Sequence, residues 1–242
     1  MNTSELLALV NAEPLLKRHC LGVVPADFLP WRIDPGFGII ANTADSSSDG
    51  EHWSTIYNSP LGQLEYFCSY GNKMSAYHSG WVDFAARHCD KVLYNPYRIQ
   101  EFGSNVCGLY AVFFLLFRIR NWSYEEIVCN LLNKTPSVND TFIECYVQNF
   151  FEIDVLRNIP LRGQKCKPFN PLIKSLMLYC WTAAPSIVRN VNYDELGPIR
   201  ANSGQARKKP CTVVVKNISP RLRAIAMETI FLSTTVHSSR ST

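Results

Sequence analysis

The chain has 242 residues, of which 47% are hydrophobic and 18% are charged, and this composition excludes wholesale disorder and suits one domain, alone or with an appendage. Nine cysteines without a CxxC pair, and histidines that do not pair with them at short intervals, favour reduced thiols over a disulfide framework or a zinc site. The longest apolar run, 108–117, is too short to cross a bilayer, and no secretory signal is expected. The sequence therefore predicts an intracellular protein, nuclear or cytoplasmic, with no membrane contact and no cofactor.

Charge is distributed unevenly along the chain. Residues 1–153 carry 10 Lys and Arg against 16 Asp and Glu, a net charge of −6, whereas residues 154–242 carry 14 against 4, a net charge of +10. This change predicts a domain over 1–153 followed by a basic extension over 154–242, which forms an accessory lobe or is partly disordered. The composition of the extension allows a nucleic-acid contact but favours a solvated basic tail, and its segment 203–210 is typical of an exposed linker.

Short helices and strands are predicted in the first half of the chain. An amphipathic pattern over 4–18 predicts a helix with Ser4 as its N-cap, and Pro14 divides this helix into two pieces. The next residues predict a strand with a turn over 22–30 and a second strand over 37–44, which the loop 45–50 follows. A hairpin is predicted over 52–71 and a helix over 73–90. The two hairpin strands are expected near 52–58 and 63–68.

A buried helix is the main feature of the second half. Residues 107–119 are apolar on all sides, so this helix is expected to lie in the core. A short strand precedes it at 91–95, and two helices follow at 123–132 and 137–151, the first with a capping box formed by Ser123 and Glu126. The mixed order of strands and helices predicts an α+β domain.

Cys107 stands where a polar loop meets the buried helix. A cysteine nucleophile must become a thiolate, and the N-terminus of a helix favours negative charge. Gly108 would let a substrate approach closely. Because most cysteines are inert buried thiols, Cys107 is a candidate nucleophile only if a base and an oxyanion donor accompany it.

His52 and Gln100 are the candidates for these two roles. His52 opens a strand directly after the loop 45–50, and Trp53 follows it as a possible wall of a cleft. Gln100 lies seven residues before Cys107, where its side-chain amide is able to donate to an oxyanion together with the backbone N–H of the nucleophile. Each of these residues, taken alone, is equally consistent with an ordinary structural role.

Together these residues resemble the adenovirus-protease-like (adenain-like) cysteine peptidases of the ubiquitin-like, or SUMO-type, protease clan. The motifs that carry the resemblance are Asn-Thr-Ala at 42–44, Gly-Glu-His-Trp at 50–53, "YFCSYG" at 66–71, and Gln100 followed after seven residues by Cys107-Gly108-Leu109. Residues 22–30 also look like the substrate-side segment of viral and Maverick/polinton-type transposon relatives. The resemblance covers about residues 20–153.

The resemblance implies a papain-like or adenain-like fold, in which a mixed central sheet packs against the helix that bears the nucleophile. Cys107 would attack the peptide carbonyl, His52 would accept and return the proton, and Gln100 with the Cys107 N–H would form the oxyanion hole. The implied substrate is a protein or peptide, either a viral- or transposon-type precursor or a ubiquitin-like modifier. Activation of the adenovirus enzyme by DNA implies a nucleic-acid contact through 154–242.

Cys68 occupies the position of the acidic third member of the family triad. A carboxylate there would orient the imidazole and stabilise the imidazolium, and a thiol is a poor substitute. Glu65 lies an odd number of residues from Cys68 on one strand, so it is predicted to point to the opposite face. Asp49, in the loop before His52, is a candidate stand-in for this acid. Three alternatives stay open: a Cys–His dyad, a different group in place of the acid, and a catalytically impaired pseudoprotease that binds protein chains.

Overall fold

The computed structural model describes residues 1–132 and 135–151, so the predicted basic extension over 154–242 lies outside the described residues. A five-stranded mixed sheet forms the centre of this part of the chain. Its strands, in spatial order, are β1 (Cys20–Val24), β2 (Gly38–Asn42), β3 (Trp53–Asn58), β4 (Leu64–Phe67) and β5 (Leu93–Tyr94). The outer pairs are parallel and the inner pairs antiparallel.

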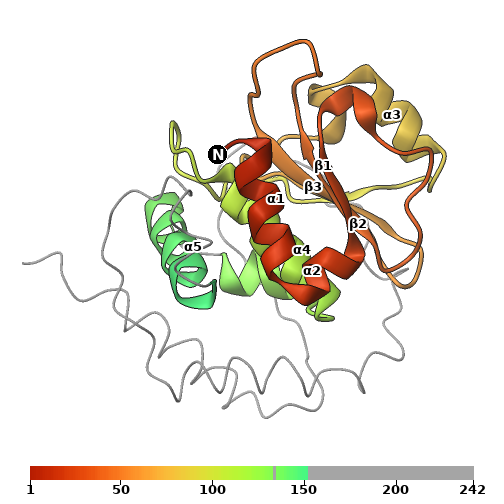
Figure 1. Cartoon of the computed structure of the whole chain (residues 1–242). Coiled ribbons are helices and arrows are strands. Elements are labelled where there is room, and N and C mark those ends of the chain that lie inside the picture. Colours follow the sequence, from red (N-terminus) through yellow and green to blue (C-terminus); the bar gives the residue numbers. More distant parts are fainter. Residues whose placement is uncertain (133–134, 152–242) are drawn as a thin grey trace, which may run out of the picture.

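Alternation of side chains along the central strands gives the sheet two apolar faces, each covered by its own set of helices. One hydrophobic cluster contains Ile39, Ile56 and Tyr66, and the cluster on the other face contains their neighbours Ile40, Tyr57 and Phe67. The chain is therefore an α+β protein with helices on both faces of the sheet, as the mixed order of elements predicted (Figure 1).

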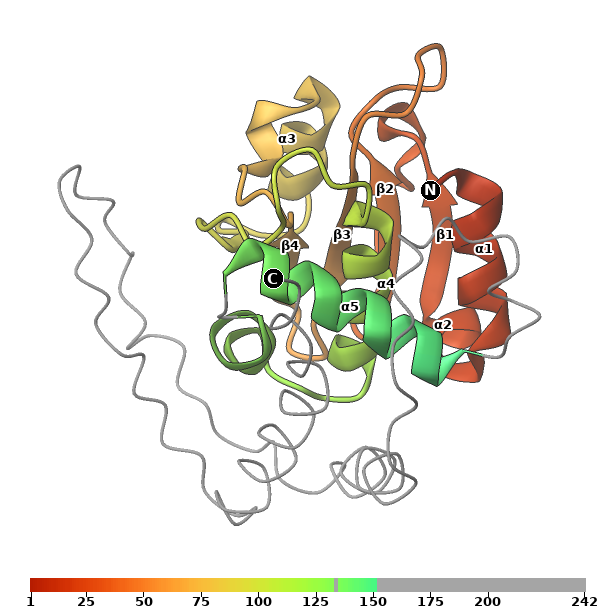
Figure 2. The same ribbon diagram turned by 90° about the vertical axis from the view of Figure 1, so that its left-hand side faces the viewer.

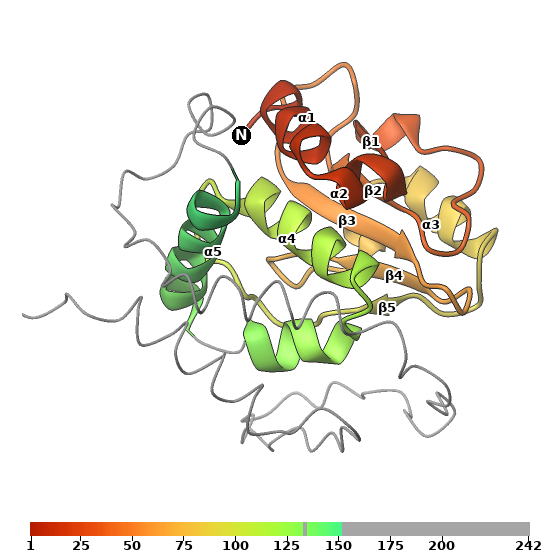
Figure 3. The same ribbon diagram turned by 60° about the horizontal axis from the view of Figure 1, so that its bottom comes forward.

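The buried helix predicted over 107–119 is α4 (Cys107–Ile119), and its bounds are confirmed. It packs along β3, where the Thr55 hydroxyl donates to the Ala111 carbonyl over 3.0 Å. Three further helices cover α4 on this face: α1 (Thr3–Ala12), α2 (Pro14–His19) and α5 (Pro136–Phe150). Figure 2 shows α5 beside α4, and Figure 3 shows α4 on the opposite side of the sheet from α3.

The other face carries α3 (Ser79–Ala86) and two short 3₁₀ turns, η1 (Ala26–Phe28) and η2 (Met74–Ala76). The indole N–H of Trp81 donates to the Ala26 carbonyl over 2.8 Å and so ties α3 to η1. The single helix predicted over 73–90 is wrong in its extent. His78 has an extended backbone, with φ −132° and ψ 131°, and its Nδ1 accepts the N–H of Gly80 over 3.2 Å, which caps α3 and leaves Tyr77 between two helices.

The first helix also differs in its cap. Asn2, not Ser4, caps α1: its side chain accepts the N–H of Glu5 over 3.0 Å, and the Glu5 carboxylate accepts the N–H of Asn2 over 2.6 Å. This reciprocal pair satisfies two N–H groups, whereas a lone hydroxyl satisfies one. The predicted division is confirmed, because α1 ends at Ala12 and α2 begins at Pro14.

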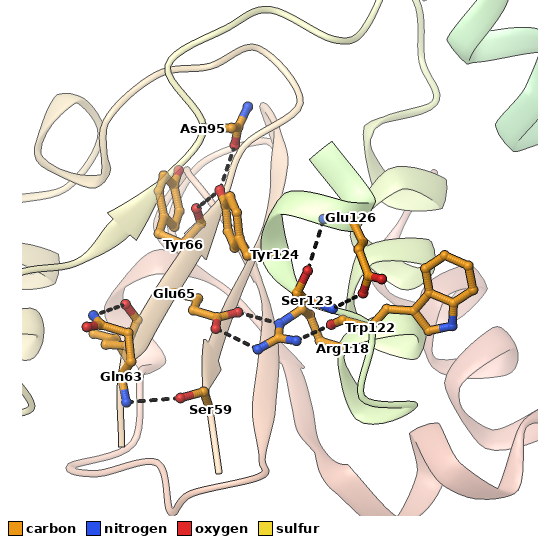
Figure 4. Close-up of polar contacts among 11 residues, drawn as sticks. Ser59, Gln63, Glu65, Tyr66, Asn95, Arg118, Trp122, Ser123, Tyr124 and Glu126 are labelled. Atoms are coloured by element: carbon orange, nitrogen blue, oxygen red, sulfur yellow. Dashed lines mark hydrogen bonds and ion pairs between the residues drawn. The ribbon is translucent and has the colours of Figure 1, made fainter. Parts of the chain in front are cut away.

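The capping box predicted at Ser123 and Glu126 is confirmed, with bonds of 2.9 and 3.1 Å between each backbone N–H and the other side chain (Figure 4). The helix that follows, η3 (Glu126–Leu131), is a π-helix. Its wider turn is seen in the bond from the Leu132 N–H to the Ile127 carbonyl, five residues back.

The described residues bear on two expectations, the absence of a membrane-spanning helix and the reduced state of the cysteines. None of the helices in 1–132 and 135–151 is long and apolar enough to cross a membrane. In the same part of the chain Cys20, Cys68, Cys89, Cys107 and Cys129 are free thiols, whereas Cys145 is in a disulfide. The prediction of uniformly reduced thiols is therefore wrong for Cys145.

Candidate active site

His52 and Cys68 meet because β3 and β4 are antiparallel neighbours. Thr55 pairs with Phe67, so the residues just before β3 and just after β4 reach the same edge of the sheet. His52 is 5% exposed and Cys68 is fully buried. The Nε2 atom of His52 lies 3.4 Å from the Sγ atom of Cys68. The position that the resemblance assigns to the acid therefore lies beside the imidazole, and it holds the Cys68 thiol.

Two tyrosines that the sequence reasoning did not single out contact the same imidazole. The rings of Tyr70 and Tyr77 stack on His52 with centroid distances of 4.6 and 6.0 Å. The Tyr77 hydroxyl lies 3.3 Å from Cys68 Sγ and accepts a 2.8 Å hydrogen bond from the side-chain amide of Asn72. Tyr70 was visible as the aromatic residue of "YFCSYG", but no sequence signal pointed to Tyr77.

Cys107 begins α4 and is half-buried. The backbone N–H of Trp53, the residue after His52, lies close enough to the Cys107 thiol to lower its pKa. Among the described residues no side chain caps the N-terminus of α4, so its first N–H groups stay available to an anion. The fold thus brings the candidate nucleophile to the start of β3, next in the chain to the candidate base.

Burial keeps the Cys107 thiol and the His52 imidazole neutral. It lowers the pKa of His52 from 6.5 to about 4 and raises the pKa of the Cys107 thiol, although the Trp53 N–H offsets part of the second shift. At neutral pH the resting site therefore holds a thiol and a neutral imidazole. A neutral imidazole is the form that accepts a proton, so these shifts suit general-base catalysis and disfavour a preformed thiolate–imidazolium pair.

The two acidic residues considered for the third role do not reach His52. Glu65 points to the opposite face, as predicted, and forms a buried ion pair with Arg118 through two contacts of 2.6 and 2.7 Å (Figure 4). Asp49 lies in the exposed loop. The lowered pKa of His52 has burial as its cause, without a contribution from a carboxylate. The idea that Asp49 stands in for the acid is therefore wrong for this arrangement.

Gln100 is fully buried, and its side-chain amide is engaged within the protein. The amide nitrogen donates to the Ser104 carbonyl and hydroxyl over 2.7 and 2.9 Å, and the amide oxygen accepts the Ser69 hydroxyl over 2.6 Å. A third neighbour of the nitrogen is the Tyr70 hydroxyl at 3.5 Å. Tyr70 thus contacts both residues, His52 through its ring and Gln100 through its hydroxyl. The Gln100 amide nitrogen must break its hydrogen bonds to Ser104 before it can donate to an oxyanion.

A pocket of about 500 Å³ opens beside Cys107. Its walls include Trp53, Asn42 at the end of β2, and the acidic residues Asp45 and Glu51 of the β2–β3 loop. Met1 lies against Gly108, since a Cβ atom on that glycine would stand 2.8 Å from the Met1 sulfur. The space beside Gly108 that the sequence reasoning assigned to substrate is therefore taken by Met1, and the open volume lies toward the loop.

Comparison with known proteins leaves the site to be interpreted from its own geometry. No protein-family model matches the chain, and no curated protein matches it. In 1–132 and 135–151 no group of three His, Cys, Asp or Glu side chains is placed to hold a metal ion.

Proposed function

We propose that the chain is a cysteine-type endopeptidase with an adenain-like fold, in which Cys107 is the nucleophile and His52 the general base. The observation that supports it most strongly is that Cys107 and Trp53 line one pocket, where the Trp53 N–H lowers the pKa of the Cys107 thiol. This contact joins the N-terminus of α4 to the residue that follows His52. The pocket beside Cys107 gives a peptide access to the thiol.

In this mechanism His52 takes the thiol proton of Cys107 as the sulfur attacks the substrate carbonyl. The proton then passes from the imidazolium to the leaving amine, and water hydrolyses the thioester. The oxyanion would be held by the backbone N–H of Cys107 at the uncapped end of α4, and by Gln100 after its amide turns from Ser104. Because the thiolate forms only during attack, slow turnover is expected.

The substrate class in this proposal is a protein or peptide, with a viral- or transposon-type precursor or a ubiquitin-like modifier as the two candidate sources. The net charge of +10 over 154–242 supports a nucleic-acid contact as a further part of the proposal. Salt-dependent retention on DNA, compared between the full chain and a chain lacking 154–242, tests that part. Equal retention of both proteins would reject it.

A second candidate function is a pseudoprotease that binds protein chains without cleaving them. Two observations favour it: a thiol stands where the triad acid belongs, and the Gln100 amide is held by Ser104. On this alternative the pocket beside Cys107 still receives a peptide, but the thiol is not activated.

Turnover of a fluorogenic Gly-containing peptide by the full chain separates the two candidates. The peptidase predicts measurable wild-type turnover that is lost in Cys107→Ala and in His52→Ala but kept in Cys89→Ala, a matched removal of another free thiol. Activity that appears only in Cys68→Asp would favour the pseudoprotease. Labelling by a thiol-reactive peptide probe adds a second measurement, and equal labelling of Cys107 and of the other free thiols in the described part of the chain would contradict the role of Cys107.

A further inference from the structure

A chain of hydrogen bonds links His52 to Tyr77 where a carboxylate is missing. His52 Nε2 lies 3.4 Å from Cys68 Sγ, and this sulfur lies 3.3 Å from the Tyr77 hydroxyl. We propose that Tyr77 is a positioning residue whose oxygen accepts the thiol proton of Cys68, so that the sulfur accepts a hydrogen bond from the Nε2–H of His52. The tyrosine thereby makes the thiol act as an acceptor, as a carboxylate would.

The difficulty with a thiol in this position is that it both donates and accepts, whereas an ionised carboxylate only accepts. A carboxylate beside Nε2 fixes the proton on Nε2 and leaves Nδ1 as the free base. A thiol that turns its proton toward Nε2 gives the opposite tautomer, with the proton on Nδ1. The direction of the Cys68 S–H bond therefore decides which nitrogen of His52 is able to take a proton.

The surroundings of Nδ1 indicate which tautomer is present. This atom is buried and has no hydrogen-bond partner within the described part of the chain. A buried N–H without an acceptor is rarer in proteins than an acceptor that is left without a donor. The unprotonated state of Nδ1 is therefore favoured, which places the proton on Nε2 and requires Cys68 to accept it.

With Nε2 donating, the thiol proton of Cys68 needs an acceptor elsewhere, and the Tyr77 oxygen is within reach. The amide nitrogen of Asn72 can only donate, and it already gives one hydrogen bond of 2.8 Å to this oxygen. A phenol oxygen has room for a second donor, which is the thiol. Tyr77 is half-buried, so its own O–H can point to solvent. In this arrangement the Nε2–H of His52 has Cys68 as its acceptor, the S–H of Cys68 has Tyr77, and the O–H of Tyr77 has solvent.

This inference deepens the proposed function, since it rests on Nδ1 being the atom that takes the Cys107 proton, but its first test needs no turnover. In the full chain with ¹⁵N-labelled histidine near neutral pH, the ring nitrogens of His52 are assigned by their loss in His52→Gln. Wild type is expected to show the Nε2–H tautomer. Tyr77→Phe is expected to shift the population toward Nδ1–H, because the thiol proton then turns to Nε2.

Two variants separate this role from a general loss of structure. In a Cys68→Asp background Tyr77→Phe should leave the tautomer unchanged, because a carboxylate has no proton to redirect. Tyr94→Phe removes the hydroxyl of another half-buried tyrosine that packs against the same apolar cluster, and it should behave as wild type. If the peptidase is active, Tyr77→Phe should lower kcat by roughly tenfold or more with little change in KM.

A wild-type spectrum with the proton on Nδ1 would overturn the inference, and so would an unchanged tautomer in Tyr77→Phe. Loss of turnover in Tyr77→Phe that persists in the Cys68→Asp background would also count against it. Absence of turnover in every variant, with the expected tautomers, would reject the peptidase and leave the inference standing.

Discussion

The ring of Tyr70 lies nearly parallel to the ring of His52, with 4.6 Å between the ring centroids and 26° between the planes. Within 1–132 and 135–151 no carboxylate bonds to this imidazole, and the flat contact with Tyr70 helps to orient the ring instead. Stacking restricts the tilt of the ring, whereas the hydrogen bond to Cys68 restricts its rotation within the plane.

The two parts of the Tyr70 side chain are expected to differ in importance. Tyr70→Phe keeps the ring and loses a hydroxyl whose contacts to Gln100 and Ser104 are both long, at 3.5 Å, so kcat/KM should fall less than about threefold. Tyr70→Leu removes the stacking partner and should lower kcat/KM by roughly tenfold or more. Peptide turnover by the two variants measures the difference, and equal losses would show that the ring does not hold the imidazole.

The depressed pKa of His52 predicts a loss of stability in acid. Its pKa is about 4 in the folded chain and ordinarily 6.5, so the unfolded chain binds a proton first as the pH falls. The stability that this group contributes is complete above pH 6.5 and is lost as the pH falls to about 4, an effect of roughly 3 kcal/mol. Urea unfolding at pH 7 and pH 4.5 measures it. His52→Gln should lose less stability over this interval than wild type, and parallel losses would contradict the assignment.

The raised pKa of Cys107 predicts slow alkylation at neutral pH. Because burial disfavours its thiolate, the rate of reaction with iodoacetamide should be low at pH 7 and should rise only above the ordinary thiol range. Mass spectrometry of the Cys107 peptide follows the rate, and the same protein in urea is the control for an unburied thiol. A fast rate that is independent of pH between 6 and 8 would instead indicate a preformed ion pair with His52.

Gly38 is expected to be essential to the packing of β2. A Cβ atom there would lie 2.5 Å from a Leu115 methyl group of α4 and 3.0 Å from the Ile56 carbonyl, so Gly38→Ala should destabilise the fold by about 1–3 kcal/mol. Gly22→Ala in β1 is the matched control, because the nearest atom to its Cβ would be a Val24 methyl group at 3.4 Å. Thermal or urea unfolding compares the two. Similar unfolding free energies would show that α4 moves away without cost.

The parts of the fold that local patterns determine were predictable. The apolar run of α4 and the alternating strands of the hairpin carry their structure in the spacing of their own residues, and both appear where expected. The place of Cys68 beside His52 followed from the motif "YFCSYG", because an antiparallel hairpin brings its two ends together.

The surroundings of the candidate site depend on contacts that no local pattern records. Tyr77 is available to Cys68 only because His78 interrupts the predicted helix and caps the next one. The spacing of Gln100 from Cys107 made it a candidate oxyanion donor, but the orientation of its amide is set by Ser69 and Ser104 from two different loops. Spacing along the chain identifies such residues, whereas hydrogen-bond direction requires the folded structure.

The buried ion pair between Arg118 and Glu65 anchors the C-terminal end of α4 to β4, whereas Cys107 lies at the other end of the helix. Arg118 follows Cys107 by eleven residues, which is about 16 Å along a helix. A tilt of about 5° around the anchored end would move the Cys107 end by about 1.4 Å, enough to change an attack geometry. Glu65 of this pair lies on β4, and Cys68 directly follows that strand, so the anchor and the neighbour of the imidazole are only three residues apart in the chain. On the proposed function, small changes in packing around Arg118 would therefore displace the Cys107 thiol and change the rate, although no residue of the site is altered.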